Sequence, residues 1–160
     1  MASKIVLGID PGIADTGYGF IKVGANKLEC LAYGSIKTTP NLSLPERLSK
    51  LYQDLMALIK LYQPQEAAVE QLFFNKNVRT ALIVGQARGV ALLALNQSGL
   101  VINDFTPAQV KSAVSAYGKA SKQQVQKMVK LILGLEEIPK PDDAADALAV
   151  AICGANTRYY

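Results

Sequence analysis

Four carboxylates in this sequence have the positions of acids that cluster to do chemistry. Asp10 ends the apolar segment "IVLGID" and Glu70 ends "AAVE", so each acid is expected at the tip of a strand. Asp143 and Asp146 are three residues apart in "PDDAADALAVAI", a spacing that places both on one face of a helix. Four carboxylates at one place would repel one another unless divalent cations lay among them.

The sequence contains no histidine, and this restricts the chemistry that the acids can support. Ser-His-Asp catalysis, Cys-His catalysis and His-ligated zinc are excluded. Ligation by carboxylates alone suits hard cations, Mg²⁺ with Mn²⁺ as a substitute. Two such ions, about 4 Å apart, would activate a water and stabilise the leaving oxygen in phosphodiester hydrolysis. We therefore expect a two-metal site held by the four acids.

Each acid taken alone has a simpler interpretation. A single Asp at the end of a strand is more often a turn or capping residue, and we assign Asp142 to capping the last helix. Two strand-tip acids together with an i, i+3 pair on an apolar helix form a more specific pattern than any one of them.

Basic residues are concentrated in the middle of the chain. Residues 71–135 hold eight bases and one acid, whereas the rest of the chain holds nine bases and twelve acids. This distribution favours a polyanion held beside a metal site, although a solvated lysine face would give the same count. Lys111, Lys119 and Lys122 are candidates for contact with phosphate or for charge stabilisation near the leaving group.

The segment "LFFNKNVR", residues 72–79, has the composition of a surface that binds unpaired bases. Adjacent aromatic residues flanked by basic and amide side chains are what unpaired bases stack on. We expect Phe73 to point at nucleic acid and Phe74 to be shared between nucleic acid and the core. Lys76 and Arg79 complete the expected nucleic-acid-binding set.

A small number of elements must position these residues. Strands are expected at 4–9, 19–23, 28–38, 66–69 and 101–105, and helices after Ser43 to 62 and at about 77–97, 107–113, 122–133 and 142–151. This order predicts an α/β fold in which a mixed five-stranded sheet has helices on its faces. Ligands bind outside the carboxyl ends of strands in such sheets, where Asp10 and Glu70 can converge.

The helix expected at 77–97 is apolar around most of its circumference. It either packs one side on the sheet and the other on a second subunit, or is the central core helix of a monomer. Gly85 and Gly89, four residues apart, would allow another backbone to approach closely.

The chain as a whole is expected to form one domain, 1–160. We expect no apolar run to approach a membrane span, and the N-terminus lacks the long apolar stretch of a signal peptide. Cys30 and Cys153 are isolated, which indicates a reducing cytoplasm and no disulfide.

Several motifs in order resemble the RuvC-type Holliday junction resolvases of bacteria over nearly the whole chain: "GIDPG…TGYG", "VEQLFFNKN", "GQARGV", "QVK", "KQQVQKMV" and "DAADALAVAI". The resemblance implies a ribonuclease-H-like fold, a homodimer, and Mg²⁺-dependent paired nicks across four-way junction DNA. It also implies the RuvA–RuvB branch-migration complex as a partner. The roles that carry over are metal-binding catalytic carboxylates at Asp10, Glu70, Asp143 and Asp146, a wedge at the junction centre at Phe73, and active-site lysines at Lys111 and Lys122.

Two positions depart from the family pattern. The segment "VSAYGKAS" stands where the family usually reads Val-x-Gly-x-Gly, which leaves the DNA contacts of Tyr117 and Lys119 open. Some relatives carry histidine at the third carboxylate position, which is Asp143 here.

Three other functions stay open from the residues alone. An ATP-binding phosphotransferase of the actin and sugar-kinase type shares an acidic Gly-Ile-Asp strand end, but it needs a second lobe for which 160 residues leave no room. A non-catalytic DNA-binding module would not need all four carboxylates. A nuclease of the same fold that cuts an RNA–DNA hybrid would carry the same acids.

Overall fold

The strands form one mixed sheet in this computed structural model, which describes residues 3–72 and 77–157. They are β1 (Lys4–Asp10), β2 (Asp15–Val23), β3 (Leu28–Lys37), β4 (Glu66–Glu70) and β5 (Val101–Phe105), in the order β3-β2-β1-β4-β5. β2 is antiparallel to both β1 and β3, whereas β4 is parallel to β1 and β5. Because β1 and β4 are adjacent and parallel, their carboxyl ends, with Asp10 and Glu70, lie at the same edge of the sheet.

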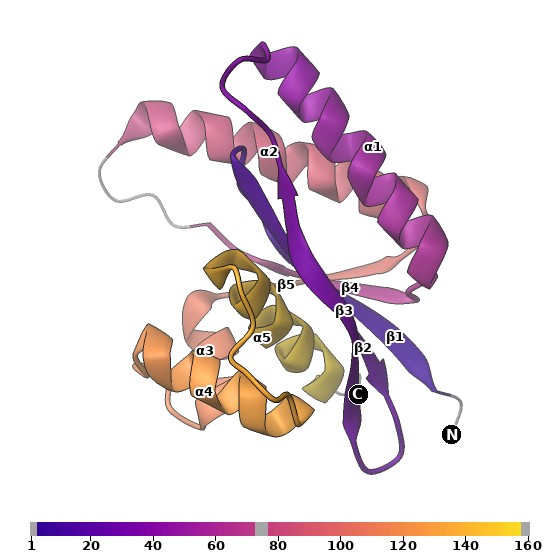
Figure 1. The fold of residues 1–160 in the computed structure, drawn as a ribbon, viewed down its shortest axis with the longest axis vertical. Coiled ribbons are helices and arrows are strands. Elements are labelled where there is room, and N and C mark those ends of the chain that lie inside the picture. The colour runs from indigo at the N-terminus through magenta and orange to yellow at the C-terminus, as the bar shows by residue number, and fades with distance from the viewer. Residues whose placement is uncertain (1–2, 73–76, 158–160) are drawn as a thin grey trace.

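Helices cover both faces of this sheet (Figure 1). Helices α1 (Leu44–Tyr62) and α2 (Val78–Gln97) lie on one face, and α3 (Pro107–Ser115), α4 (Lys122–Leu133) and α5 (Asp142–Asn156) lie on the other. The predicted α/β architecture, a mixed five-stranded sheet between helices, is therefore confirmed.

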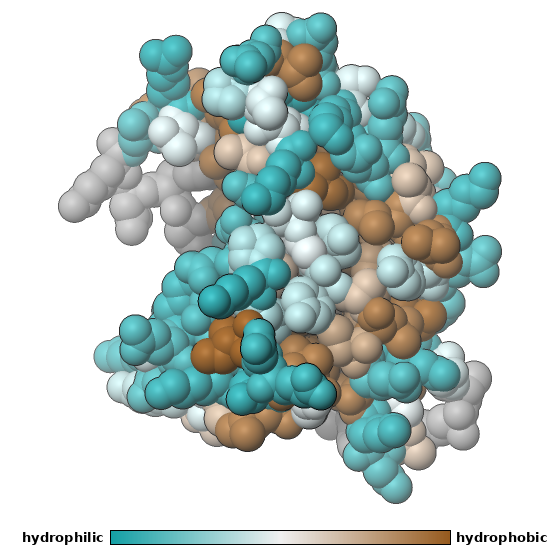
Figure 2. All heavy atoms as spheres, viewed as in Figure 1, coloured by the Kyte–Doolittle hydropathy of each residue, from teal (hydrophilic) through white to brown (hydrophobic). Residues whose placement is uncertain are grey.

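Each face of the sheet has its own hydrophobic core. Leu7, Ile9 and Phe20 pack beneath α1 and α2, whereas Val6 and Ile21 pack beneath α5. Alternate residues of a strand point to opposite faces, so the two cores share the strands between them. On the face of the molecule seen in Figure 2, hydrophilic residues cover most of the surface and hydrophobic residues lie in smaller patches.

Side chains satisfy the backbone at the start of four helices. Ser43, Thr106 and Ser121 form capping boxes at the starts of α1, α3 and α4. The Asn77 side chain accepts hydrogen bonds from the backbone of the first turn of α2. The starts expected at Ser43, Thr106 and Ser121 are thus confirmed.

Helix α5 begins differently, and the capping role expected for Asp142 is wrong. Its N-cap residue is Pro141, which follows a cis peptide bond and makes no side-chain cap hydrogen bond. Asp142 is already the first helical residue, and its carboxylate contacts Gln126 and Lys122 of α4 instead. The local sequence could not reveal this because both contacts come from another helix.

Helix α5 lies against β1 and β2 at a distance that requires glycine. A Cβ added to Gly8 would collide with the carbonyl oxygen of Ala147, and one added to Gly17 would collide with that of Asp143. The "TGYG" segment is therefore part of β2, which begins at Asp15 and not at the expected Gly19. Gly17 and Gly19 of this segment are buried under α5, and glycines there give no apolar pattern that signals a strand.

Helix α2 buries one side only. The buried residues are Ala87, Ala91, Ala94 and Leu95. On the other side Val78, Leu82 and Leu93 are 76%, 64% and 50% exposed. Gly85 and Gly89 lie on the same side as these three residues, and together the five form the exposed stripe of α2. No atom lies within 4 Å of a Cβ built on either glycine. The alternative of a central core helix is therefore wrong for the described chain on its own.

By length and composition α2 also qualifies as a membrane-spanning segment, contrary to expectation. Its most apolar window has a mean hydropathy of 1.4, and 22% of that window is buried. Core helices of soluble proteins pass the same test, and α2 packs its alanine face on the sheet and on α1.

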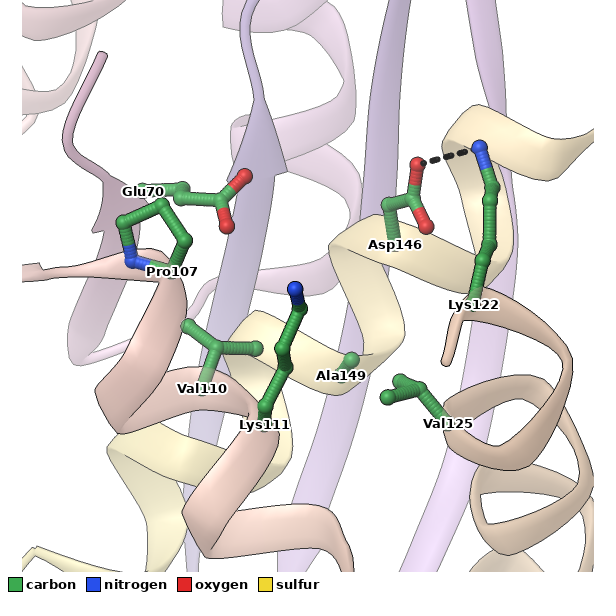
Figure 3. Close-up of a pocket in the computed structure, with 8 residues that line it drawn as sticks. All are labelled: Glu70, Pro107, Val110, Lys111, Lys122, Val125, Asp146 and Ala149. Atoms are coloured by element: carbon green, nitrogen blue, oxygen red, sulfur yellow. Dashed lines mark ion pairs between the residues drawn. The ribbon is translucent and has the colours of Figure 1, made fainter. Parts of the chain in front are cut away.

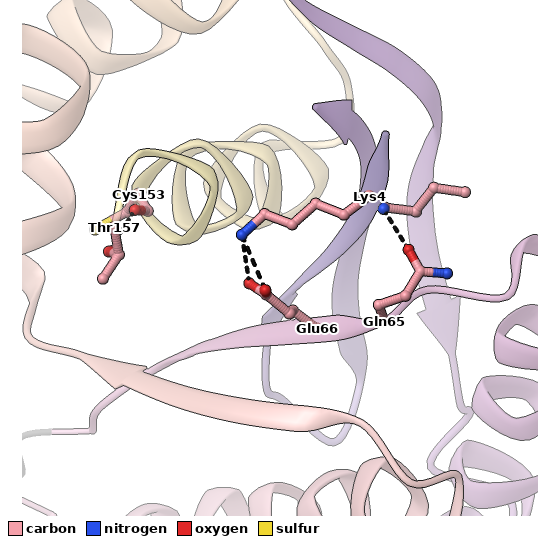
Figure 4. A network of polar contacts seen from close by, with 6 residues as sticks. Lys4, Gln65, Glu66, Cys153 and Thr157 are labelled. Carbon is pink, nitrogen blue, oxygen red and sulfur yellow. Dashed lines mark hydrogen bonds and ion pairs between the residues drawn. The ribbon is translucent and has the colours of Figure 1, made fainter. Parts of the chain in front are cut away.

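Polar contacts join the starts of β1 and β4, at the end of the sheet remote from the acids (Figure 4). Lys4 Nζ lies 2.9 Å from a carboxylate oxygen of Glu66. The backbone N–H of Ile5 donates to Gln65 Oε1 at 2.7 Å. These contacts fix the alignment of the two strands whose other ends carry Asp10 and Glu70.

Candidate active site

Three of the four predicted carboxylates form a tight group. One oxygen from each of Asp10, Asp143 and Asp146 lies within 4.8 Å of the others. Asp10 is at the end of β1, and the other two are in the first turns of α5. This is the spacing in which carboxylates can share a metal ion.

The alternation of the strands explains why Asp10 faces α5. Val6 points into the core beneath α5, so Gly8 and Asp10, two and four residues later, point to the same side. Asp10 pairs with Gly17 across the β1–β2 ladder, and Gly17 is the glycine on which the Asp143 backbone rests. The close approach of α5 to the sheet thereby sets the distance between the acids of the strand and those of the helix.

Glu70 joins the site from β4 by the same alternation, since Ala68 packs in the core beneath α5. It lies outside the three-residue group but lines a cavity of about 290 Å³ together with Asp146, Lys111 and Lys122. Figure 3 shows both lysines extending from α3 and α4 toward the carboxylates of Glu70 and Asp146. The remaining wall of the cavity is apolar and comes from Pro107, Val110, Val125 and Ala149.

The electrostatics of Asp10 are those of a buried acid among like charges. Burial, followed by the charges of Asp146, Glu70 and Asp143, raises the pKa of Asp10 to about 8, while Lys122 opposes the shift. Desolvation and neighbouring carboxylates both disfavour the ionised form. A divalent cation at this position would reverse the shift.

The other three acids also hold their protons more tightly than usual. Burial raises the pKa of Glu70, with Asp146 adding to the rise and Lys111 opposing it. Burial raises the pKa of Asp146 against the opposing effect of Lys122. A compact set of oxygen donors that repel one another fits hard divalent cations.

A fifth acid near the site was not predicted. Burial and then the charge of Asp15 raise the pKa of Asp143. Asp15 starts β2, and its carboxylate accepts a hydrogen bond from Ser35 Oγ at 2.8 Å. No sequence pattern marks Asp15, because it reaches Asp143 only through the packing of α5 on β2.

Lys122 makes the closest charged contacts with the acids. Its Nζ lies 3.4 Å from Asp146 Oδ2 and 3.5 Å from Asp142 Oδ2. The structure thus brings both predicted active-site lysines to the predicted carboxylates, Lys122 by ion pairs and Lys111 through the shared cavity.

The residues expected to bind nucleic acid are placed only in part. Arg79 is exposed in the first turn of α2, and Lys119 is exposed in the turn between α3 and α4. Phe73, Phe74 and Lys76 lie outside the described residues. The exposed positive charges and the lysine-lined cavity suit an anionic substrate held beside metal ions.

Comparison with known proteins gives matches over almost the whole chain. A family model described as "Crossover junction endodeoxyribonuclease RuvC" matches residues 6–154. The protein of that name from Heliobacterium modesticaldum is 58% identical over 153 residues, which are 96% of this chain and 94% of the relative. The one from Desulforamulus reducens is 61% identical over 151 residues, 94% of this chain and 93% of the relative.

A solved structure agrees with these matches. The structure described as "T. thermophilus RuvC in complex with Holliday junction substrate" superposes with a TM-score of 0.90 at 38% identity, covering 95% of this chain and 93% of the other.

Proposed function

The chain belongs to the RuvC family of crossover junction endodeoxyribonucleases, and we propose that Asp10, Asp143, Asp146 and the neighbouring Glu70 hold the metal ions with which it cuts DNA. It is a ribonuclease-H-like endodeoxyribonuclease that resolves Holliday junctions by paired nicks, in recombination and repair. The observation that carries the site assignment is the group formed by Asp10, Asp143 and Asp146, with oxygens within 4.8 Å.

Two features argue against the other functions considered from the residues. Gly17 lies under α5 and makes room for Asp143, so this glycine serves helix packing and not a phosphate-binding turn. The family matches are to deoxyribonucleases, which favours DNA over an RNA–DNA hybrid and catalysis over binding alone.

We propose that the site takes two Mg²⁺ ions, with Mn²⁺ as a substitute, on Asp10, Glu70, Asp143 and Asp146. When bound, the ions supply an activated water and a positive charge beside the leaving oxygen. Lys111 and Lys122 point into the same cavity, where their ammonium groups stabilise the negative charge that develops on the phosphate. Glu70 and Lys111 line the same cavity, and the charge of Lys111 opposes the rise in the pKa of Glu70.

The DNA-binding set proposed here is Phe73, Phe74, Lys76, Arg79 and Lys119. The segment that contains the first four directly follows Glu70 in the sequence, so the chain itself joins it to the proposed metal site. The exposure of Arg79 and Lys119 supports contact with phosphate.

A homodimer is proposed from the exposed stripe of α2. Two opposed strands of a junction require two sites, and a two-fold dimer provides them. Val78, Leu82 and Leu93 expose apolar surface along the stripe, and Gly85 and Gly89 leave room for a partner backbone. A second copy of the same stripe is the complementary surface.

We also propose a domain organisation, a cellular location and a partner complex. All described helices pack on one sheet, which supports a single nuclease domain over 1–160. The family resemblance supports action in the cytoplasm together with the RuvA–RuvB branch-migration complex.

The test is cleavage of a mobile four-way DNA junction and of matched duplex, with Mg²⁺ or with EDTA. Symmetric nicks are expected in the junction alone and with Mg²⁺ alone. Asp10→Asn, Glu70→Gln and Asp146→Asn should each slow cleavage by about a hundredfold or more while the junction is still bound. Asp54→Asn on the outer face of α1 is the matched control and should cut normally. Full cleavage by all three site variants would refute the assignment.

A further inference from the structure

Asp142 and Lys122 belong to a four-residue arrangement between α4 and α5. Lys122 and Gln126 are one turn apart on α4, and Asp142 and Asp146 are one turn apart on α5. Lys122 Nζ lies 3.5 Å from Asp142 Oδ2 and 3.4 Å from Asp146 Oδ2. Gln126 Nε2 donates to Asp142 Oδ1 at 3.1 Å. The two pairs therefore face each other across the helix interface.

The two carboxylates that hold Lys122 have different surroundings. Asp146 is 28% exposed and belongs to the metal-type group with Asp10 and Asp143, whereas Asp142 is 69% exposed and lies outside that group. Asp142 makes no cap hydrogen bond for α5. Both of its oxygens are instead directed at α4, one held by Gln126 and the other paired with Lys122.

These positions matter once a cation occupies the site. A divalent cation on Asp146 would compete with the Lys122 ammonium for the same carboxylate and would repel it. Lys122 would then swing into solvent unless a second anion held it. Asp142 lies at almost the same distance from Nζ as Asp146 and is oriented by Gln126, so it can retain the ammonium when Asp146 turns to the metal.

We propose that Asp142 is a positioning residue, which keeps the Lys122 ammonium at the edge of the cavity while Asp146 binds metal. The proposal rests on the proposed function, because it assigns Asp146 to the metal and Lys122 to the substrate phosphate. Figure 3 shows the Lys122–Asp146 pair that would be exchanged, among the residues that line the cavity.

The first test is a double-mutant cycle on single-turnover junction cleavage at saturating Mg²⁺. Asp142→Asn removes the charge and keeps the shape, so it should slow cleavage about threefold to fivefold, the range of a partly exposed ion pair. Asp142→Glu should restore most of the rate. Lys122→Ala should be slower still, and adding Asp142→Asn to it should change nothing further. Asp54→Asn, which breaks the exposed Lys50–Asp54 pair of α1, is the matched control and should cut at the normal rate.

The second test does not depend on activity. The ammonium signal of Lys122 in a ¹H–¹⁵N NMR spectrum, assigned by its loss in Lys122→Ala, should persist in the unmodified protein at saturating Mg²⁺. It should broaden or disappear in Asp142→Asn under the same conditions and remain in Asp54→Asn.

Three results would overturn the proposal. The first is a normal cleavage rate for Asp142→Asn. The second is that Asp142→Asn slows cleavage equally in the unmodified protein and in Lys122→Ala. The third is that the Lys122 signal of the unmodified protein is lost when Mg²⁺ is added. If the unmodified protein cut no junction at all, the proposed function would fail instead, and the NMR signal alone would decide whether Asp142 holds Lys122.

Discussion

Burial and three neighbouring carboxylates all raise the pKa of Asp10. The pKa of about 8 means that folding without metal retains a proton that the unfolded chain, with an ordinary pKa of 3.8, has lost. Stability of the metal-free protein should therefore fall as pH rises from about 4 to about 8. The proposed Mg²⁺ would bind the ionised form of Asp10, so protons are expected to compete with the metal at this residue.

The prediction at this scale concerns Asp10→Asn and pH. Without metal, the variant should melt at a higher temperature than the unmodified protein at pH 9 but differ little at pH 4, because only ionised Asp10 is destabilising. In the unmodified protein, the increase in Tm produced by Mg²⁺ should grow from pH 6 to pH 9. Thermal unfolding at each pH with EDTA or Mg²⁺ measures both effects.

Asp54→Asn serves as the control for removal of one acid, and its effect should not depend on Mg²⁺. An equal change in Tm for Asp10→Asn at pH 4 and pH 9 would contradict the electrostatic account of this carboxylate.

At the scale of elements, the site depends on how closely α5 lies on β1 and β2. Gly17→Ala should push α5 away, because the new Cβ would meet the carbonyl oxygen of Asp143. Overpacking of this kind destabilises by about 1–3 kcal/mol. Small displacements of catalytic groups slow reactions by about a hundredfold, so cleavage should fall by that order. Urea unfolding and single-turnover cleavage measure the two effects.

A control for stability is Gln53→Ala on α1. The Gln53 side chain is exposed, and alanine favours a helix slightly over glutamine. It should therefore unfold at an equal or higher urea concentration. If Gly17→Ala behaved in the same way, the close packing of α5 would not be what sets the site.

Local features of this fold could be predicted from the sequence, whereas features that depend on the packing of α5 could not. Capping boxes and strand-tip acids are local patterns, so the starts of α1, α3 and α4 and the positions of Asp10 and Glu70 were accessible. The role of Gly17 was not, because its neighbour Asp143 comes from the opposite end of the chain. Asp142 was misread for a related reason, since contacts from α4 replaced the expected local cap.

Some parts of the candidate site remain predictions. Phe73, Phe74 and Lys76 lie outside the described residues, so their proposed contact with DNA rests on composition and, for Phe73, on the family resemblance. The four carboxylates were predictable as a set because two lie at strand tips and two share a helix face. Their separation into a group of three with Glu70 across the cavity depends on tertiary packing.

At the scale of the whole molecule, the exposed stripe of α2 predicts the oligomeric state. Light scattering at micromolar concentration should give about twice the 17.2 kDa mass of the chain. Gly89→Leu should give the mass of one chain, because the leucine side chain fits the open surface of one chain but blocks the backbone of a partner. The variant should still nick junctions, but its two nicks should lose their pairing.

The control for this experiment is Leu131→Arg on α4. Leu131 is 70% exposed, and α4 lies on the other face of the sheet from α2. That variant should keep the double mass and paired nicking. If the unmodified protein had the mass of one chain, the proposed dimer would be contradicted.

The position of α5 in the chain has a consequence for how the protein is made. Asp10 leaves the ribosome early, but Asp143 and Asp146 are on the last helix, and that helix also fills the core beneath β1 and β2. Chains fold from the N-terminus during synthesis. A chain translated only as far as α4 therefore lacks two of the four proposed metal ligands and the helix that packs on β1 and β2. We therefore expect metal binding and nuclease activity only in chains that already include α5.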